Sequence, residues 1–283
     1  MTHPNKVVPI RPATPDCANR YSVEEVRAAL REGRMELHYQ PQYCLNSGRT
    51  VAAEALARLR DRNGELVYPD RFIEELEHHN LIVEFGRAVI ARACEDLKTL
   101  RSRQLPGVRV AVNLAANQLN LDCTLADFVT AELNKHGLEH GDIEFELTER
   151  QGFSAASPGA SQLVKLASRG SRVVLDDFGV GYACAASLRD LPFSAIKIDR
   201  LVLQDTARSE VRLGMLEGVL ALASRLGLEV IAEGIETIDQ EQTLKTLGFR
   251  WGQGFGYAMP MQAESLMNFL SDEVQWPASL VLG

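Results

Sequence analysis

The chain of 283 residues is 46% hydrophobic and 24% charged, as in ordinary globular proteins, and is long enough for one large domain or two small ones. Its formal net charge of −8 argues against binding long nucleic acid, which requires a basic face, but permits a small anionic ligand received by local cations. The five cysteines are scattered and form no C-x-x-C pair, so neither a disulfide framework nor a zinc cluster is indicated.

The first twenty residues hold four of the 11 prolines and show no periodicity, which predicts a flexible Pro-rich leader over 1–20. This leader lacks the apolar core of a signal peptide, and no uninterrupted apolar run is long enough to span a bilayer. We therefore expect a cytoplasmic protein without a membrane partner. Ser22 followed by Glu25 forms a capping-box pattern for a helix that ends near Arg31.

Short β-branched or apolar runs then alternate with longer helical stretches, a pattern that favours parallel βαβ units. The expected strands are Met35–Gln42, Thr50–Leu59, Val108–Asn113, Ile143–Thr148, Arg172–Asp177, Ala195–Asp199, Glu229–Glu233 and Arg250–Gly254. The expected helices that follow the first are Asp70–His79, Phe85–Leu100, Leu125–His136, Gln162–Ser168, Glu210–Leu226, Ile238–Leu247 and Ala263–Leu270. Eight strands that alternate with helices suit a closed barrel better than an open doubly wound sheet. We assign this α/β barrel to residues 21–270 and a C-terminal tail to 271–283.

Polar side chains stand at or near the ends of most of these strands. They are Glu54, Asn113, Glu146, Glu149, Asp176, Asp177, Lys197, Glu233 and Gln253. Taken singly, a carboxylate after a strand is more often a helix N-cap or a surface ion pair. In an α/β barrel, however, the carboxyl ends of the strands converge on one mouth, where active sites are built. The joint placement therefore predicts a functional site at that mouth.

The chemistry of such a mouth points to metal ions. Five of these carboxylates would crowd negative charge into a partly dry cavity, namely Glu54, Glu146, Asp176, Asp177 and Glu233. Lys197 alone cannot balance them. Mg²⁺ or Mn²⁺ can do so, because both cations prefer carboxylate and amide oxygens. Several carboxylates indicate two ions rather than one. A two-ion site activates a water and neutralises charge on a phosphate diester.

The motif EALAR at Glu54–Arg58, preceded by YQP at Tyr39–Pro41, resembles the signature of the EAL-domain cyclic di-GMP phosphodiesterases. Further motifs follow in the order of that family: NLAANQL, ELTE, DDFGVGY, KIDR, AEGIET and GQGF. The similarity extends from about Tyr21 to Pro260. It implies a modified TIM (β/α)₈ barrel with one antiparallel strand. It also implies a homodimer that hydrolyses cyclic di-GMP to linear pGpG and so lowers the messenger in bacterial signalling.

The resemblance also implies a role for each matched residue. One metal ion would be held by Glu54, Asn113, Glu146 and Asp176. Asp177 and Glu233 match residues associated with a second ion. Lys197 matches a lysine that orients or deprotonates the attacking water, and Gln253 supports that water. Glu149 matches a glutamate that fixes the loop after DDFG. Gln40 and Arg58 resemble substrate contacts, with Arg58 at a phosphate.

Two departures from the family pattern lie in supporting positions. Ala115 stands where serine is usual, and the loop after DDFG carries Val180 and Ala183–Cys184 in place of its usual residues. In the family this loop links the metal site to the dimer interface. Two alternatives therefore stay open, namely a silent receptor for cyclic di-GMP and a protein-interaction module, either with an unidentified regulatory protein as partner. The leader is too short for an upstream sensory domain, so we expect the EAL domain to stand alone.

Overall fold

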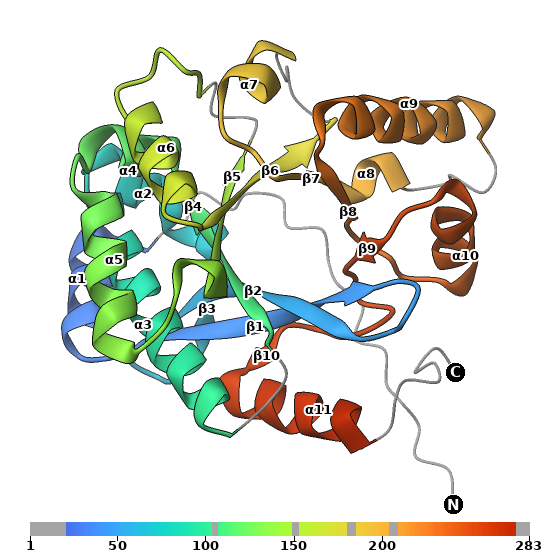
Figure 1. The fold of residues 1–283 in the computed structure, drawn as a ribbon. Helices are drawn as coiled ribbons and strands as arrows, with labels where there is room; N and C mark the ends of the chain where they lie inside the picture. Colours follow the sequence, from blue (N-terminus) through green and yellow to red (C-terminus); the bar gives the residue numbers. More distant parts are fainter. Residues whose placement is uncertain (1–20, 104–106, 149–152, 180–184, 204–208, 276–283) are drawn as a thin grey trace, which may run out of the picture.

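The computed structural model describes residues 21–103, 107–148, 153–179, 185–203 and 209–275 (Figure 1). Eight of the described strands form a closed barrel, in the order β1–β9–β8–β7–β6–β5–β4–β2 with β2 paired to β1. Their bounds are β1 Met35–Cys44, β2 Thr50–Arg60, β4 Arg109–Leu114, β5 Ile143–Thr148, β6 Arg172–Phe178, β7 Ala195–Ile198, β8 Glu229–Ala232 and β9 Trp251–Gly252. Two short strands, β3 Leu66–Val67 and β10 Met261–Gln262, pair with β2 and β1. The predicted α/β barrel is confirmed.

Strand β1 is the reversed strand of the barrel. It pairs antiparallel with β2, from Met35 opposite Leu59 to Tyr43 opposite Thr50, and also antiparallel with β9. The other neighbouring pairs in the barrel are parallel. A short turn suffices to join β1 to β2 because antiparallel strands need no crossover helix. The predicted modified barrel with one antiparallel strand is therefore confirmed.

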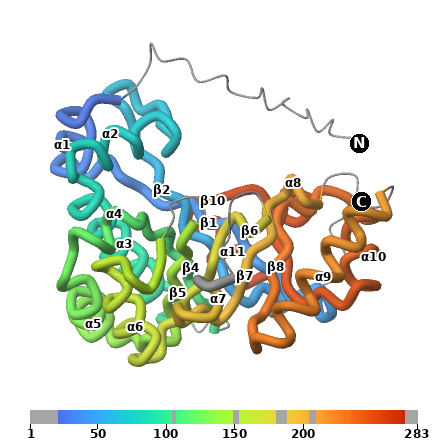
Figure 2. The backbone as a smooth tube through the Cα atoms, turned by 90° about the horizontal axis from the view of Figure 1, so that it is seen from above, coloured from blue at the N-terminus to red at the C-terminus, as the bar shows by residue number. Residues whose placement is uncertain are grey.

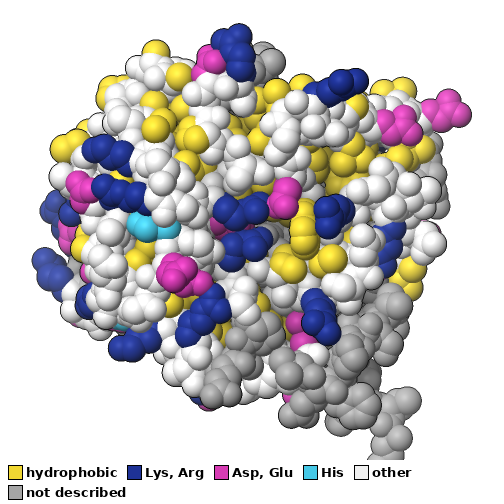
Figure 3. All heavy atoms as spheres, in the orientation of Figure 1, with side chains coloured by type: hydrophobic (Ala, Val, Ile, Leu, Met, Phe, Trp, Pro, Cys, Tyr) yellow, Lys and Arg dark blue, Asp and Glu magenta, His cyan; other side chains and the backbone are white. Residues whose placement is uncertain are grey.

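Helices surround the barrel, and α1 and α2 lie together on one side of the molecule (Figure 2). The bounds are α1 Val23–Arg31, η2 Pro69–Arg71, α2 Ile73–His78, α3 Ile82–Ser102, α4 Ala116–Leu121, α5 Leu125–His136, η3 His140–Asp142, α6 Ala160–Ser168, α7 Ala185–Asp190, α8 Arg200–Leu203, α9 Glu210–Leu226, α10 Ile238–Leu247 and α11 Ala263–Gln275. Among the helices of the described residues, none has both the length and the apolar character needed to cross a bilayer. On the face shown in Figure 3, acidic and basic side chains are interspersed.

Several predicted elements coincide with the observed ones, including β5, α5, α9 and α10. The capping box of Ser22 and Glu25 is also present. Other elements differ in their bounds. The helix expected over Asp70–His79 is split into η2 and α2, because Phe72 is buried with a non-helical backbone (φ −137°, ψ −21°). The strand expected over Arg250–Gly254 is shorter, and α11 extends five residues past Leu270 into the predicted tail.

The short helices α4, α7 and α8 were not predicted, because four to six residues are too few for helical periodicity to emerge. The predicted leader 1–20 and the last residues of the predicted tail, 276–283, lie outside the described residues. The parallel strands themselves are buried on both faces, as in β4, where Val110, Ala111 and Val112 are fully buried. This double burial makes the barrel wall a rigid support for side chains at the strand ends.

Close packing between α4 and the start of α6 generates a stability prediction. A Cβ added at Gly159 would lie 2.4 Å from the backbone carbon of Leu119, whereas a Cβ added at Gly141 would meet nothing within 4 Å. We expect Gly159→Ala to lower the free energy of unfolding by about 1–3 kcal/mol, because rigid backbone must move. Gly141→Ala is the matched control and should change it by less than about 0.5 kcal/mol. Calorimetric melting checks both, and equal melting temperatures for the two variants would contradict the packing argument.

Candidate metal-binding site at the barrel mouth

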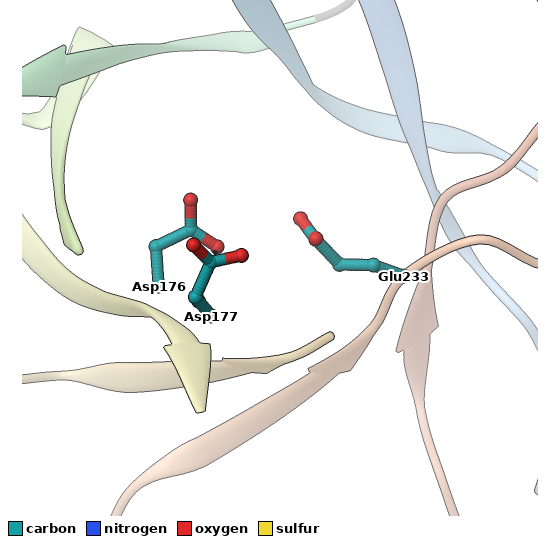
Figure 4. Close-up of side chains that lie close together, drawn as sticks. All are labelled: Asp176, Asp177 and Glu233. Carbon is teal, nitrogen blue, oxygen red and sulfur yellow. Dashed lines mark hydrogen bonds between the residues drawn. The ribbon is translucent and has the colours of Figure 1, made fainter. Parts of the chain in front are cut away.

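The barrel brings together polar side chains that are far apart in the sequence. Glu54 lies on β2, Glu146 on β5 and Lys197 on β7, while Glu233 and Gln253 directly follow β8 and β9. Asn113 lies on β4, and Asp176 and Asp177 lie on β6. In Figure 4, Glu233 extends towards Asp176 and Asp177 from the opposite side of the opening. Each strand contributes one or two polar residues because successive side chains alternate between the barrel interior and the outer layer.

Lys197 is the centre of this group. Its side chain is fully buried, and its Nζ lies 2.6 Å from Glu233 Oε1 and 2.8 Å from Glu146 Oε2. The same Nζ is 3.2 Å from Glu54 Oε2 and 3.6 Å from Asp176 Oδ1. One ammonium group therefore serves four carboxylates. A lysine with three N–H donors cannot satisfy all of them at good geometry.

The ionisation of the group follows from this shortage of positive charge. Burial lowers the pKa of Lys197, but the four facing carboxylates outweigh burial and raise that pKa well above its usual value. Burial also raises the pKa of Glu146 well above its usual range, and it raises the pKa of Asp176. For Glu233, burial raises the pKa to about 8 against the partial compensation by Lys197. The mouth therefore holds more carboxyl groups than its lysine can keep ionised.

The pKa of Glu54 is shifted in the opposite direction from the pKa values of the other three carboxylates. Burial favours its protonated form, but the charge of Lys197 and hydrogen bonds from two amides outweigh burial and lower its pKa. Gln253 Nε2 donates to Glu54 Oε2 at 2.8 Å, and Asn113 Nδ2 donates to Glu54 Oε1 at 2.9 Å. Gln253 Nε2 also lies 3.1 Å from Glu233 Oε1. The charge of Lys197, with these amides, therefore favours the charged form of Glu54.

The carboxylates of Asp176, Asp177 and Glu233 lie close enough together to bind one metal ion. One oxygen from each carboxylate lies within 4.8 Å of the others. Asp177 has a φ of +58°, a left-handed conformation that is uncommon for residues with a side chain, and its N–H donates to Asp176 Oδ1 at 2.9 Å. Backbone strain of this kind occurs most often at functional sites, where the surrounding structure maintains it. Here it turns two consecutive carboxylates towards the same opening.

The residues present fit divalent cations. The donors are carboxylate and amide oxygens, which suit Mg²⁺ or Mn²⁺. The Oε1 atom of Gln253 is buried and has no hydrogen-bond partner among the described residues, so it is an unused oxygen at the mouth. Divalent cations would also supply the positive charge that Lys197 alone cannot provide.

Gln42 is a residue of the site that the sequence analysis missed. Its side chain is buried, and its Nε2 donates to Glu146 Oε1 at 3.3 Å. The sequence of β1 could have indicated this role, because Gln40 and Gln42 alternate there with Tyr39 and Tyr43. Two buried amides on one face of a strand indicate polar partners inside the barrel.

The two predicted substrate contacts lie beside the carboxylate group without bonding to it. Gln40 is the cross-strand neighbour of Glu54, and its Nε2 donates to the carbonyl oxygen of Ala258 at 3.1 Å. Arg58 follows Glu54 by four residues on β2 and donates from Nη1 to the carbonyl oxygen of Ala57 at 2.8 Å. Glu149 and the altered loop Val180–Cys184 lie outside the described residues, so their predicted roles stay predictions.

A family model described as the EAL domain matches residues 23–260 of the chain. The chain is 36% identical over 247 residues to the cyclic di-GMP phosphodiesterase NbdA of Pseudomonas aeruginosa, an alignment that covers 87% of the chain and 31% of NbdA. It is 30% identical over 250 residues to the cyclic di-GMP phosphodiesterase RocR of the same organism, covering 88% of the chain and 63% of RocR. The chain thus spans less than two thirds of either relative.

Among solved structures, the fold resembles one described as the PaMucR phosphodiesterase in complex with c-di-GMP. The TM-score is 0.79 and the sequence identity is 32%. The match covers 86% of this chain and 98% of the PaMucR chain. Most of the chain therefore has a counterpart in a structure described as a complex with the cyclic dinucleotide.

The raised carboxyl pKa values predict how stability depends on pH when divalent ions are chelated. Between the ordinary carboxyl pKa and about 8, folded Glu233 keeps a proton that the unfolded chain releases, so stability falls as pH rises. The free energy of unfolding should fall by an amount on the order of a few kcal/mol between pH 5.5 and 8.5. Glu233→Gln should reduce this slope, whereas Glu264→Gln, on an exposed part of α11, should preserve it. Calorimetry at both pH values measures the slopes, and equal slopes in Glu233→Gln and the wild type would contradict the assignment.

The donor set also predicts stabilisation by divalent ions. At pH 8, Mg²⁺ or Mn²⁺ at a hundred times its dissociation constant should stabilise the fold by about 2.7 kcal/mol, because only the folded chain presents the site. Asp177→Asn should weaken this effect, since it removes one of the three clustered carboxylates. Asp127→Asn on α5 is the control and should respond like the wild type. A melting temperature that is insensitive to both ions would rule out a divalent site.

Proposed function

The chain belongs to the EAL domain family, and from this membership we propose that it is a metal-dependent phosphodiesterase that hydrolyses cyclic di-GMP to linear pGpG. The observation that carries the proposal is the buried Lys197, whose Nζ contacts four carboxylates at the barrel mouth. The names of NbdA and RocR support the reaction, and the PaMucR complex supports the ligand. Hydrolysis of the cyclic dinucleotide would lower the messenger in bacterial signalling.

We assign metal binding to the oxygen donors at the mouth. One Mg²⁺ or Mn²⁺ ion would be held by Glu54, Asn113, Glu146 and Asp176, and a second by Asp177 with Glu233. When bound, such ions supply an activated water and neutralise charge on the phosphate diester. The position of Asp176 supports two adjacent ions, because one of its oxygens lies within 4.8 Å of oxygens of Asp177 and Glu233, the residues assigned to the second ion.

Lys197 and Gln253 then act on the attacking water. We assign Lys197 to orienting or deprotonating that water, because its Nζ lies among the carboxylates that would hold the ions. The Oε1 of Gln253, which has no hydrogen-bond partner in the described part of the chain, can accept a hydrogen bond from the same water. Hydrolysis forms one bond from the water oxygen to phosphorus and breaks the bond to the 3′-oxygen, which leaves as a hydroxyl after taking up a proton. Glu149 keeps its predicted role in fixing the loop after DDFG.

We assign substrate binding to Gln40 and Arg58 on the two strands that form the β1–β2 hairpin. Both side chains are more than nine-tenths buried and lie on the same strands as the metal-binding residues. A guanidinium group presents N–H donors in a planar fork that matches the oxygens of a phosphate. Arg58 would thus provide the local cation that an acidic protein needs in order to hold an anionic dinucleotide.

The homodimer implied by the family resemblance is part of this proposal. It is supported by apolar side chains exposed along one face of α9: Val211, Met215, Leu222 and Leu226. Their spacing of four, seven and four residues places them on a single helical stripe. The regulatory protein partner and the cytoplasmic location stay predictions from the sequence.

The activity is tested by incubating the purified protein with cyclic di-GMP and Mg²⁺ or Mn²⁺ and resolving the nucleotides by chromatography. We expect pGpG to form with the wild type, and Glu54→Ala to lower the rate by more than about a hundredfold, since even residues outside the metal ligands commonly contribute up to that factor. Glu264→Gln serves as the matched control and should retain activity, because its side chain is exposed on α11.

The outcomes separate the candidate functions. Turnover by the wild type together with loss in Glu54→Ala supports the phosphodiesterase and its centre at Glu54. Binding of cyclic di-GMP without conversion under either metal would favour the receptor instead. Equal turnover by Glu54→Ala and the wild type would refute the assigned site.

A further inference from the structure

Tyr68 lies over the side chain of Arg58. The Arg58 Cζ atom is 4.8 Å from the centre of the Tyr68 ring, and the tyrosine is 50% exposed. The pairing of β2 with β3 explains this contact. Leu59 is opposite Val67, so the antiparallel register makes Arg58 and Tyr68 the next facing pair. Facing residues of antiparallel strands project to the same side, which brings the ring to the guanidinium.

The backbone around Tyr68 is anchored on both sides. Val67 before it and Phe72 after it are buried, each with about 1% of its surface exposed. Tyr68 itself has an extended backbone (φ −89°, ψ 157°), which is the conformation favoured by a residue that precedes proline. The ring is therefore presented from a fixed position at the edge of the barrel.

Arg58 has hydrogen-bonding capacity that the described residues do not use. Its Nε is buried without a hydrogen-bond partner among them, and its Nη1 donates to a carbonyl oxygen of the adjacent residue. Burial lowers the pKa of Arg58, with partial compensation by Tyr68, Glu54 and Asp70. A buried cation with an unpaired N–H suits an anionic oxygen. The aromatic face contributes an attraction that leaves the planar edge of the guanidinium available.

We propose that Tyr68 is a positioning residue that holds the Arg58 guanidinium flat against its ring, so that the N–H edge faces a phosphate of the bound phosphodiester. This inference rests on the proposed function, because Arg58 meets that phosphate only if the mouth binds the dinucleotide. Tyr68 does not touch the reacting atoms. Its effect is to fix the orientation of Arg58 before the ligand arrives, which reduces the ordering required for binding.

Steady-state kinetics with cyclic di-GMP tests the proposal. Tyr68→Leu removes the ring but keeps an apolar side chain, and we expect KM to rise by roughly three- to tenfold with kcat within about twofold, as the loss of a cation–π contact predicts. Tyr68→Phe keeps the ring and should restore the wild-type KM. Tyr21→Leu is the matched control, because it removes a second tyrosine–arginine contact, with Arg71 at 5.9 Å, and should leave KM unchanged.

A double-mutant cycle and an NMR signal complete the test. In an Arg58→Ala background, Tyr68→Leu should have little further effect on KM, since each change removes the same cation–π contact. The Arg58 Nε–H resonance, assigned by its loss in Arg58→Lys, should shift in Tyr68→Leu and persist in Tyr68→Phe. This NMR measurement does not require turnover. If the wild-type protein were inactive, the proposed function would be refuted, but the contact between Tyr68 and Arg58 could still be measured. An unchanged resonance or an unchanged KM in Tyr68→Leu would overturn the role of Tyr68.

Discussion

The contact between one buried ammonium group and four carboxylates is the constraint on which the site depends. Lys197 on β7 faces Glu54, Glu146, Asp176 and Glu233, which come from or directly follow four other strands. Such a concentration of buried charge is costly unless it is paired, and breaking one pair leaves another charge uncompensated. The rest of the molecule provides the rigid wall that keeps these groups together, and the excess of carboxylates creates the demand for divalent cations.

The reversed strand β1 decides how the barrel closes and thus which residues meet. Because β1 pairs with both β2 and β9, the last strand of the barrel is brought next to the first hairpin. Gln253 can therefore donate to Glu54 although 199 positions separate them in the sequence. The same closure places Gln40 beside Glu54 and beneath the carbonyl of Ala258. The proposed metal ligand Glu54 and the proposed substrate contacts Gln40 and Arg58 therefore lie on a single hairpin.

Around this centre, uncharged and aromatic side chains contact the charged residues. Asn113 and Gln253 donate hydrogen bonds to Glu54, and Gln42 contacts Glu146 through the opposite oxygen from Lys197. Tyr68 covers the guanidinium of Arg58 at the edge of the same strand. These neighbours show how an acidic chain with a net charge of −8 can offer a local environment suited to an anionic ligand.

The sequence by itself determined the alternation of strands and helices and the charged residues at the strand ends, and its resemblance to the EAL-domain family implied the barrel with one antiparallel strand. These features follow from local patterns and from ordered motifs such as EALAR and DDFGVGY, which can be read without knowing the fold. Only the tertiary structure decided that Lys197 is shared by four carboxylates, that Gln42 contacts Glu146, and that Tyr68 covers Arg58. These contacts depend on strand register and barrel closure. Both arise from side-chain packing over long separations in the sequence, so no local pattern could reveal them.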